Sequence, residues 1–212
     1  MLPGGPASFK TVGRRWGGMD RASGRAGTVA GIVAPLVFLV LYSVAAVGDP
    51  EYVFLQNYLS DLGVGARAVF FNSAVIIAGG LTVPFALLGV RPALDGGIAA
   101  NAAVLLTVVA AVFLMLVGVF TEDYGGTHYA VSVGFFMTML AALLCYSFTL
   151  HFSNALGRRV TDLTMAAAGL GVVLTVIGFD PQTETVAVLA IVVWGLLVAL
   201  TLFKREAGAD TY

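Results

Sequence analysis

The stretch 49–72, DPEYVFLQNYLSDLGVGARAVFFN, connects two long apolar runs of the chain. Its first residue, Asp49, is followed by proline, which predicts the start of a helix because aspartate caps helices and proline fits their first turn. Gly63 should end that helix, since glycine readily adopts the left-handed conformation of a C-terminal cap. One face of the short helix would then carry three polar residues, Asn57, Ser60 and Asp61. Polar side chains beside a membrane need partners, so we expect this stretch to be the centre of any function.

The two flanking runs belong to a set of six. Of the 212 residues, 59% are hydrophobic and 11% are charged, whereas a soluble domain carries about 25% charged residues. A membrane-spanning helix needs about 20 mostly apolar residues. Six segments fit this requirement: 28–47, 68–90, 98–120, 129–152, 163–179 and 185–203. We therefore expect an all-α, polytopic membrane protein, a bundle of six transmembrane helices with a short interfacial helix in the first outer loop.

The rest of the chain is assigned to tails. Residues 1–27 are rich in glycine and basic residues and predict a disordered cytoplasmic tail, with Met19 as an alternative start. Residues 28–205 form the six-helix domain, and 206–212 a second cytoplasmic tail. The single Cys145 excludes an internal disulfide or a cysteine metal cluster. The net charge of −1 predicts no nucleic-acid partner.

Basic residues predict the orientation of the chain in the cell membrane. Of the eleven Lys and Arg residues, only Arg67 falls on the side of the 49–67 connection. The positive-inside rule therefore places both termini in the cytoplasm and this connection outside. The outer connections then hold seven of the twelve acidic residues: Asp49, Glu51, Asp61, Glu122, Asp123, Asp180 and Glu184.

The residues that could carry chemistry also lie in these outer connections. Asp61 and His128 are the candidates for catalysis, as a general base or as metal ligands. The candidates for binding are Asn57, Ser60, Asn72, Glu122, Asp123, Asp180 and Glu184. The spacing of these residues matches no metal motif. No cofactor is predicted, and a divalent metal is the weaker alternative.

Two of these assignments have simpler alternatives. Ser60 and Asp61 would serve equally well as caps of the connecting helix. Asn72 lies just inside the second apolar segment, where a polar side chain is costly and faces another helix. We expect its partner to be Asn57 or Asp61.

Small residues and proline predict how the helices pack. Gly27 and Gly31 form a GxxxG pair, which favours close packing inside the bundle over a face for a homo-oligomer. Pro84 should kink the second helix or lie near its end. Segment 163–179 is short and holds small residues, so we expect it to be buried among the others.

The order of three sequence features carries a family resemblance. The segment NYLSDLG at 57–63 is followed by Phe71-Asn72 and then by His128. In this order the chain resembles the uncharacterised prokaryotic membrane family catalogued as domain of unknown function 998, from about residue 28 onward. The resemblance implies six membrane helices with the LSDLG motif in the first outer loop. It implies no activity.

Three classes of function stay open. The first is an enzyme or binding protein that acts on a lipid headgroup at the outer surface, with membrane lipids as partners. The second is a structural or partner-binding membrane protein in which the outer residues only join helix ends. The third is a small-solute transporter. The interiors of the six segments contain no Asp, Glu, Lys or Arg, which disfavours transport because pathways carry ionisable residues at mid-membrane.

Overall fold

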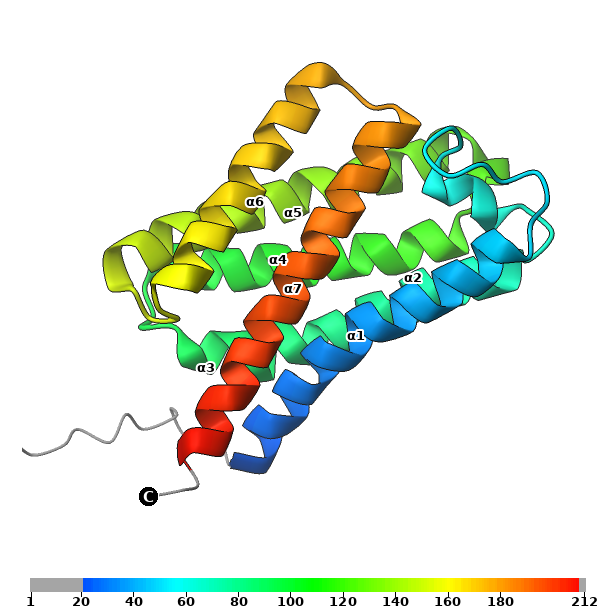
Figure 1. Ribbon diagram of the computed structural model, residues 1–212. Helices are drawn as coiled ribbons and strands as arrows, with labels where there is room; N and C mark the ends of the chain where they lie inside the picture. The colour runs from blue at the N-terminus through cyan, green and yellow to red at the C-terminus, as the bar shows by residue number, and fades with distance from the viewer. Residues whose placement is uncertain (1–20, 210–212) are drawn as a thin grey trace, which may run out of the picture.

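The computed structural model describes residues 21–209, and this part of the chain is helical without any strand (Figure 1). Its elements are α1 (Arg21–Val47), the 3-10 turn η1 (Leu59–Gly63), α2 (Ala68–Pro84), the π-helical η2 (Phe85–Val90), α3 (Arg91–Ala93), α4 (Ile98–Val119), the 3-10 turn η3 (Glu122–Tyr124), α5 (Gly126–Ser153), α6 (Arg158–Ile177) and α7 (Pro181–Ala209). The segments α2, η2 and α3 form one continuous helix.

Six of the described helices are long and apolar enough to cross a membrane, with 20 to 28 residues each. The predicted fold class is therefore confirmed: the protein is an all-α, multi-pass membrane protein. Its helices extend beyond the predicted segments, since α1 begins at Arg21 and α7 ends at Ala209. Residues 21–27 and 206–209, which were assigned to the tails, are therefore helical. The remaining tail residues lie outside the described part of the chain.

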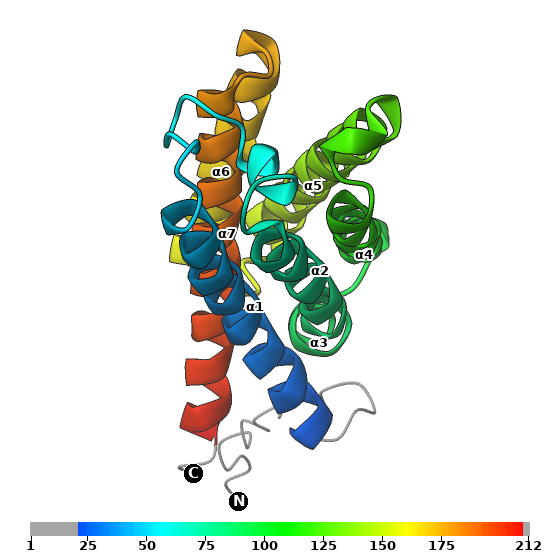
Figure 2. The ribbon, with the colours of Figure 1, turned by 90° about the vertical axis from the view of Figure 1, so that its right-hand side faces the viewer.

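The six long helices close a ring. Each packs against the next one along the chain, and α7 packs against α1 (Figure 2). The connections 48–67, 120–125 and 178–180 meet at one end of the ring, here called the acidic end. The start of α1, the connections 94–97 and 154–157, and the end of α7 lie at the other end, here called the basic end.

Glycines let α1 and η2 approach closely. A Cβ atom at Gly31 would overlap the ring of Phe85, and one at Gly27 would lie 2.5 Å from the backbone nitrogen of Gly89. The GxxxG pair is thus used inside the bundle, as the sequence favoured. The α-helical part of α2 ends at Pro84, as predicted, and continues as the π-helical η2. Proline removes one backbone donor, and a π turn is a common way to accommodate such an interruption.

The expectation that segment 163–179 is buried is wrong. Helix α6 packs against α5 and α7, and only 22% of its most apolar window is buried. A Cβ atom at Gly169 would meet open space, whereas one at Gly171 would lie 2.9 Å from the Leu140 side chain. Small residues permit close approach, but a second helix must be present to use it. In this ring α6 has no third helix beside it among the described residues.

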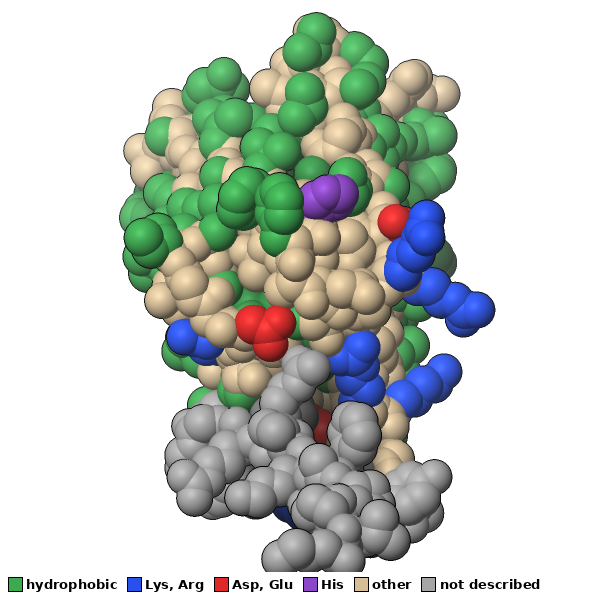
Figure 3. All heavy atoms as spheres, turned by 90° about the vertical axis from the view of Figure 1, so that its left-hand side faces the viewer, with side chains coloured by type: hydrophobic (Ala, Val, Ile, Leu, Met, Phe, Trp, Pro, Cys, Tyr) green, Lys and Arg blue, Asp and Glu red, His purple; other side chains and the backbone are tan. Residues whose placement is uncertain are grey.

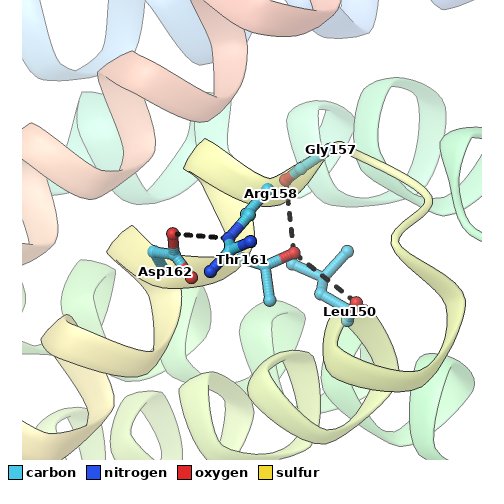
Figure 4. Close-up of polar contacts among 5 residues, drawn as sticks. All are labelled: Leu150, Gly157, Arg158, Thr161 and Asp162. Atoms are coloured by element: carbon cyan, nitrogen blue, oxygen red, sulfur yellow. Dashed lines mark hydrogen bonds and ion pairs between the residues drawn. The ribbon is translucent and has the colours of Figure 1, made fainter.

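The basic end carries every Lys and Arg side chain of the described residues except Arg67. Figure 3 shows basic side chains below a largely hydrophobic surface on the face to the left of Figure 1. At the α5–α6 connection, Thr161 Oγ1 lies 3.2 Å from the carbonyl oxygen of Gly157 and 3.5 Å from that of Leu150, and its hydroxyl donates to them (Figure 4). Arg158 and Asp162 form an exposed ion pair at 3.8 Å in the first turns of α6.

Candidate functional site

The connection 48–67 is mostly irregular, so the predicted helix starting at Asp49 is wrong. Only 59–63, the LSDLG motif, forms a helical turn, η1. Leu55 has a φ of 66°, which interrupts any helix before it. The Asp49 carboxylate accepts hydrogen bonds from the backbone N–H groups of Glu51 and Ala66, both at 3.0 Å. Asp49 therefore ties the two ends of the connection together instead of capping a helix.

Three predicted binding residues lie apart from the others. Asn57 accepts a 2.9 Å hydrogen bond from the backbone N–H of Val53 in an exposed turn, so it shares no helix face with Ser60. Asp123 is exposed in η3. Asp180 accepts a 2.7 Å hydrogen bond from the backbone N–H of Thr183, which holds the pKa of its carboxyl below the usual range. Asn57 and Asp180 thus accept local hydrogen bonds in their turns, and Asp123 faces water.

The LSDLG turn is joined to two other segments by carboxyl groups. The hydroxyl of Ser60 donates a 2.8 Å hydrogen bond to Glu122 Oε1 in η3. The backbone N–H of Leu59 donates to Glu184 Oε2 in the first turn of α7 at 2.5 Å. Ser60 and Glu184 are both more than nine-tenths buried. These hydrogen bonds hold η1 across the acidic end of the ring (Figure 2).

Asp61 and Glu122 form a carboxyl pair. Asp61 Oδ2 accepts a 2.9 Å hydrogen bond from the backbone N–H of Tyr58, and the Asp61 carboxyl lies close enough to Glu122 to influence its pKa. Burial, then the contact with Asp61, raise the pKa of Glu122, while the Ser60 hydroxyl opposes this shift. Asp61, Glu122 and Glu184 are together called the carboxyl cluster below.

His128 lies beside this cluster in the first turn of α5. It is 9% exposed, and its Nδ1–H donates a 2.7 Å hydrogen bond to the carbonyl oxygen of Phe120. Its Nε2 lies 3.4 Å from Ser132 Oγ. His128 is near enough to Glu122 for a positive charge on the imidazole to lower the pKa of Glu122. The structure thus brings both predicted catalytic candidates, Asp61 and His128, into the surroundings of one glutamate.

Asn72 has a different partner from the one predicted. Its Nδ2 donates a 3.0 Å hydrogen bond to the carbonyl oxygen of Gly63, not to Asn57 or Asp61. Its Oδ1 is buried and has no hydrogen-bond partner within the described residues. The Asn72 side chain thus meets the backbone at the end of η1 and not a side chain of the loop. Asn72 therefore holds the LSDLG turn against α2.

A cavity of about 130 Å³ lies inside the ring, below η1. Its walls are mainly apolar side chains of α1, α2, α4, α5 and α7, including Phe38, Val75, Ala110, Leu114, Phe135 and Val192. At the acidic end the wall is polar and includes Ser60, Ser132 and Glu184. Trp194 lines the far part, ten residues along α7 from Glu184, or about 15 Å at 1.5 Å per residue. The cavity therefore runs from the carboxyl cluster toward the middle of the helices.

Ser132 is the wall residue that the sequence analysis missed. It lies one helical turn after His128, at the i+4 position, so the two side chains share a face of α5. With His128 as a candidate, the i+4 spacing was sufficient to predict that Ser132 lies beside it.

The geometry offers no preformed metal centre in the described part of the chain. Within residues 21–209, no group of three or more His, Cys, Asp or Glu side chains is arranged to hold a metal ion. The metal-ligand alternative for Asp61 and His128 therefore gains no support. Hydrogen bonding and proton transfer are the chemistry that this arrangement provides.

Comparisons with known proteins identify a family. A search of the curated proteins and a search of the solved structures each found no match to this chain. A family model does match, and the matched region includes η1, the carboxyl cluster and the walls of the cavity except Gly31. The chain belongs to the family described as "Protein of unknown function (DUF998)", whose model matches residues 32–203.

Proposed function

We propose that this protein binds a membrane lipid, with an apolar part of the lipid in the cavity and its headgroup at the carboxyl cluster. The observation that carries this proposal is the cavity itself, whose walls are mainly apolar, with Ser60, Ser132 and Glu184 toward the acidic end. The two threonines of the wall, Thr82 and Thr107, donate their hydroxyls to carbonyl oxygens of their own helices. An amphiphile has the same division between an apolar chain and a polar head.

The size of the cavity supports an apolar occupant. A cavity of about 150 Å³ lined by Leu, Ile and Phe stays dry and binds benzene, and the volume here is about 130 Å³. That space holds a segment of an acyl or isoprenoid chain. An empty apolar space is unfavourable because its walls lose dispersion contacts. The apolar walls also argue against a path for ions or polar solutes, which need polar groups at mid-membrane.

The distribution of basic residues supports one orientation of the protein in the membrane. Basic residues cluster at the basic end, and only Arg67 lies at the acidic end among the described residues. By the positive-inside rule, both termini face the cytoplasm and the carboxyl cluster faces outward in the cell membrane. The bound lipid would then come from the outer leaflet.

Chemical modification of the headgroup is the second candidate function. The neighbouring carboxyl groups of Asp61 and Glu122, with the raised pKa of Glu122, favour it. A carboxyl group with a raised pKa can donate a proton and take one up again, which is the requirement for acid–base catalysis. His128 Nε2, near Ser132, is the alternative base.

Filling the cavity tests the lipid-binding proposal. Ala110 lies in the cavity wall on α4 and is 1% exposed, whereas Val112 is on the same helix and 43% exposed. We expect native mass spectrometry of wild-type protein, purified in a mild detergent, to show a bound lipid. Ala110→Leu should lose that lipid, and Val112→Leu should retain it. Thermal unfolding of both variants shows whether they are folded. Equal retention by two folded variants, or no lipid on wild-type protein, would contradict the proposal.

A further inference from the structure

Of the carboxyl cluster, Glu184 lines the cavity, while Asp61 and Glu122 adjoin it on η1 and η3. Glu184 is 9% exposed and belongs to the cavity wall, so it is a carboxyl side chain in a mainly apolar surface. Its interactions are the N–H of Leu59, the hydroxyl of Ser60 and the negative charges of Asp61 and Glu122. Within the described residues, no Lys or Arg contacts any of the three carboxyl groups.

A buried charge is unfavourable unless an opposite charge or several hydrogen-bond donors accompany it. Ser60 donates one hydrogen bond, and two backbone N–H groups donate one each. Three hydrogen bonds are donated to three carboxyl groups, so acceptor oxygens are in excess beside the cavity. Within the described residues, the cavity wall holds no Lys or Arg that could supply further donors.

We propose that the headgroup bound here is a primary amine, carried as an ammonium ion by a membrane lipid; this rests on the proposed lipid-binding function. An ammonium group has three N–H donors, and the polar part of the cavity wall offers the oxygens of Ser60, Ser132 and Glu184 as acceptors. A quaternary trimethylammonium head has the same charge but no N–H donor. A phosphate or carboxylate head in direct contact with the cluster would be repelled.

Four probes share the same decyl chain and differ in their polar head, so they separate the contribution of the head to binding from that of the chain. They are decylamine, decyltrimethylammonium, 1-decanol and decanoate, each added below its micelle-forming concentration to the full-length protein in a neutral detergent. Binding is measured by isothermal titration calorimetry at neutral pH. We expect decylamine to bind at least tenfold more tightly than decyltrimethylammonium and 1-decanol, with decanoate the weakest. This comparison needs no variant, so it does not depend on how a substitution folds.

Two variants test whether the carboxyl cluster causes the preference for decylamine. Glu184→Gln and Glu122→Gln keep a side-chain oxygen that accepts the hydrogen bond from Leu59 or Ser60, but each removes a carboxylate. Either change should reduce decylamine affinity to that of 1-decanol and leave 1-decanol affinity unchanged. Asp123→Asn removes an exposed carboxylate of the same η3 turn and should change neither affinity.

The outcomes distinguish the inference from the function on which it rests. If all four probes bind equally and Ala110→Leu abolishes binding, the lipid site stands and the amine inference is overturned. If the amine preference persists unchanged in both glutamine variants, the inference is overturned as well. If no probe binds, or if Ala110→Leu leaves probe binding unchanged, both the proposed lipid-binding function and the amine inference are overturned.

Discussion

Ser60 and Glu122 are 62 positions apart in the sequence, and the hydroxyl of Ser60 donates a 2.8 Å hydrogen bond to Glu122 Oε1. This contact joins the LSDLG turn to the connection between α4 and α5. Glu184 joins the same turn to α7, and Asn72 joins it to α2. A single turn thus links three parts of the ring at its acidic end and forms the roof of the cavity.

Removing the Ser60 hydroxyl should destabilise the folded protein at the LSDLG turn. Ser60→Ala deletes a hydrogen bond to a partly buried carboxyl group, which costs about 1–3 kcal/mol. For a chain of this size we expect the melting temperature in detergent to fall by about 2–4 °C per kcal/mol. Ser43→Ala is the control, because Ser43 is an exposed serine that bonds only the carbonyl of Leu39 in its own helix. Equal melting temperatures for wild type and Ser60→Ala would show that the contact is dispensable.

The raised pKa of Glu122 predicts how stability depends on pH. A carboxyl group whose pKa is higher in the folded chain takes up a proton on folding. Its stabilising contribution is complete below the pKa of the unfolded chain, about 4.3, and is lost as the pH rises through the folded-state pKa. Glu122→Gln imitates the protonated group. We expect its melting temperature to exceed that of wild type increasingly as the pH is raised from about 4.3 toward neutrality.

A change in net charge alone would also shift melting temperatures, so this measurement needs a matched control. Asp123→Asn removes one charge from the exposed neighbour of Glu122 in η3. Its difference from wild type should vary little over the same pH range. A pH-independent difference for Glu122→Gln would exclude a raised pKa as its cause.

Two adjacent glycines of α2 should respond oppositely to the same substitution. A Cβ atom at Gly79 would lie 2.7 Å from the backbone oxygen of Ala111 and from Met115 Cγ, whereas one at Gly80 has no atom within 4 Å. Gly79→Ala should therefore separate α2 from α4 and destabilise the protein by about 1–3 kcal/mol. Gly80→Ala should be neutral or stabilise by up to about 1 kcal/mol, the difference in helix propensity. Thermal unfolding of the pair measures this, and similar values for both would disprove the close α2–α4 contact.

Cysteine labelling tests the proposed orientation. Phe54, in the 48–67 connection, is 53% exposed, and Ile98, at the start of α4 at the basic end, is 91% exposed. In a Cys145→Ala background, which removes the native cysteine, we expect Phe54→Cys to react with a membrane-impermeant maleimide on intact cells. Ile98→Cys should react only after permeabilisation. The reverse pattern would place the carboxyl cluster on the cytoplasmic side.

Long apolar runs were enough to predict the six helices, because a membrane span is defined by local composition. Helix ends were less predictable. Asp49-Pro50 is a favourable helix start, yet Asp49 binds Glu51 and Ala66 at the two ends of the connection. Small residues in α6 indicated burial, but burial depends on a neighbouring helix. In both cases a local preference was overridden by a contact with another part of the chain.

The candidate site was predictable in its location but not in its contacts. Asp61, Glu122, Glu184 and His128 were assigned to one end because each span carries the chain across the membrane, so the first, third and fifth connections share a side. Their partners depend on how the ring closes, and no local pattern encodes this. Ser132 and the cavity were missed for the same reason, since a cavity is a property of five helices together.

By itself, the sequence determined that this chain crosses a membrane six times and that its polar side chains gather in a few connections, because both properties follow from local hydrophobicity. Only the tertiary structure decided that Ser60 meets Glu122, that Leu59 meets Glu184, and that Asn72 holds the end of the same turn. The physical reason is the closure of α7 on α1. That contact completes the ring, encloses the cavity and brings Glu184 of α7 to the LSDLG turn.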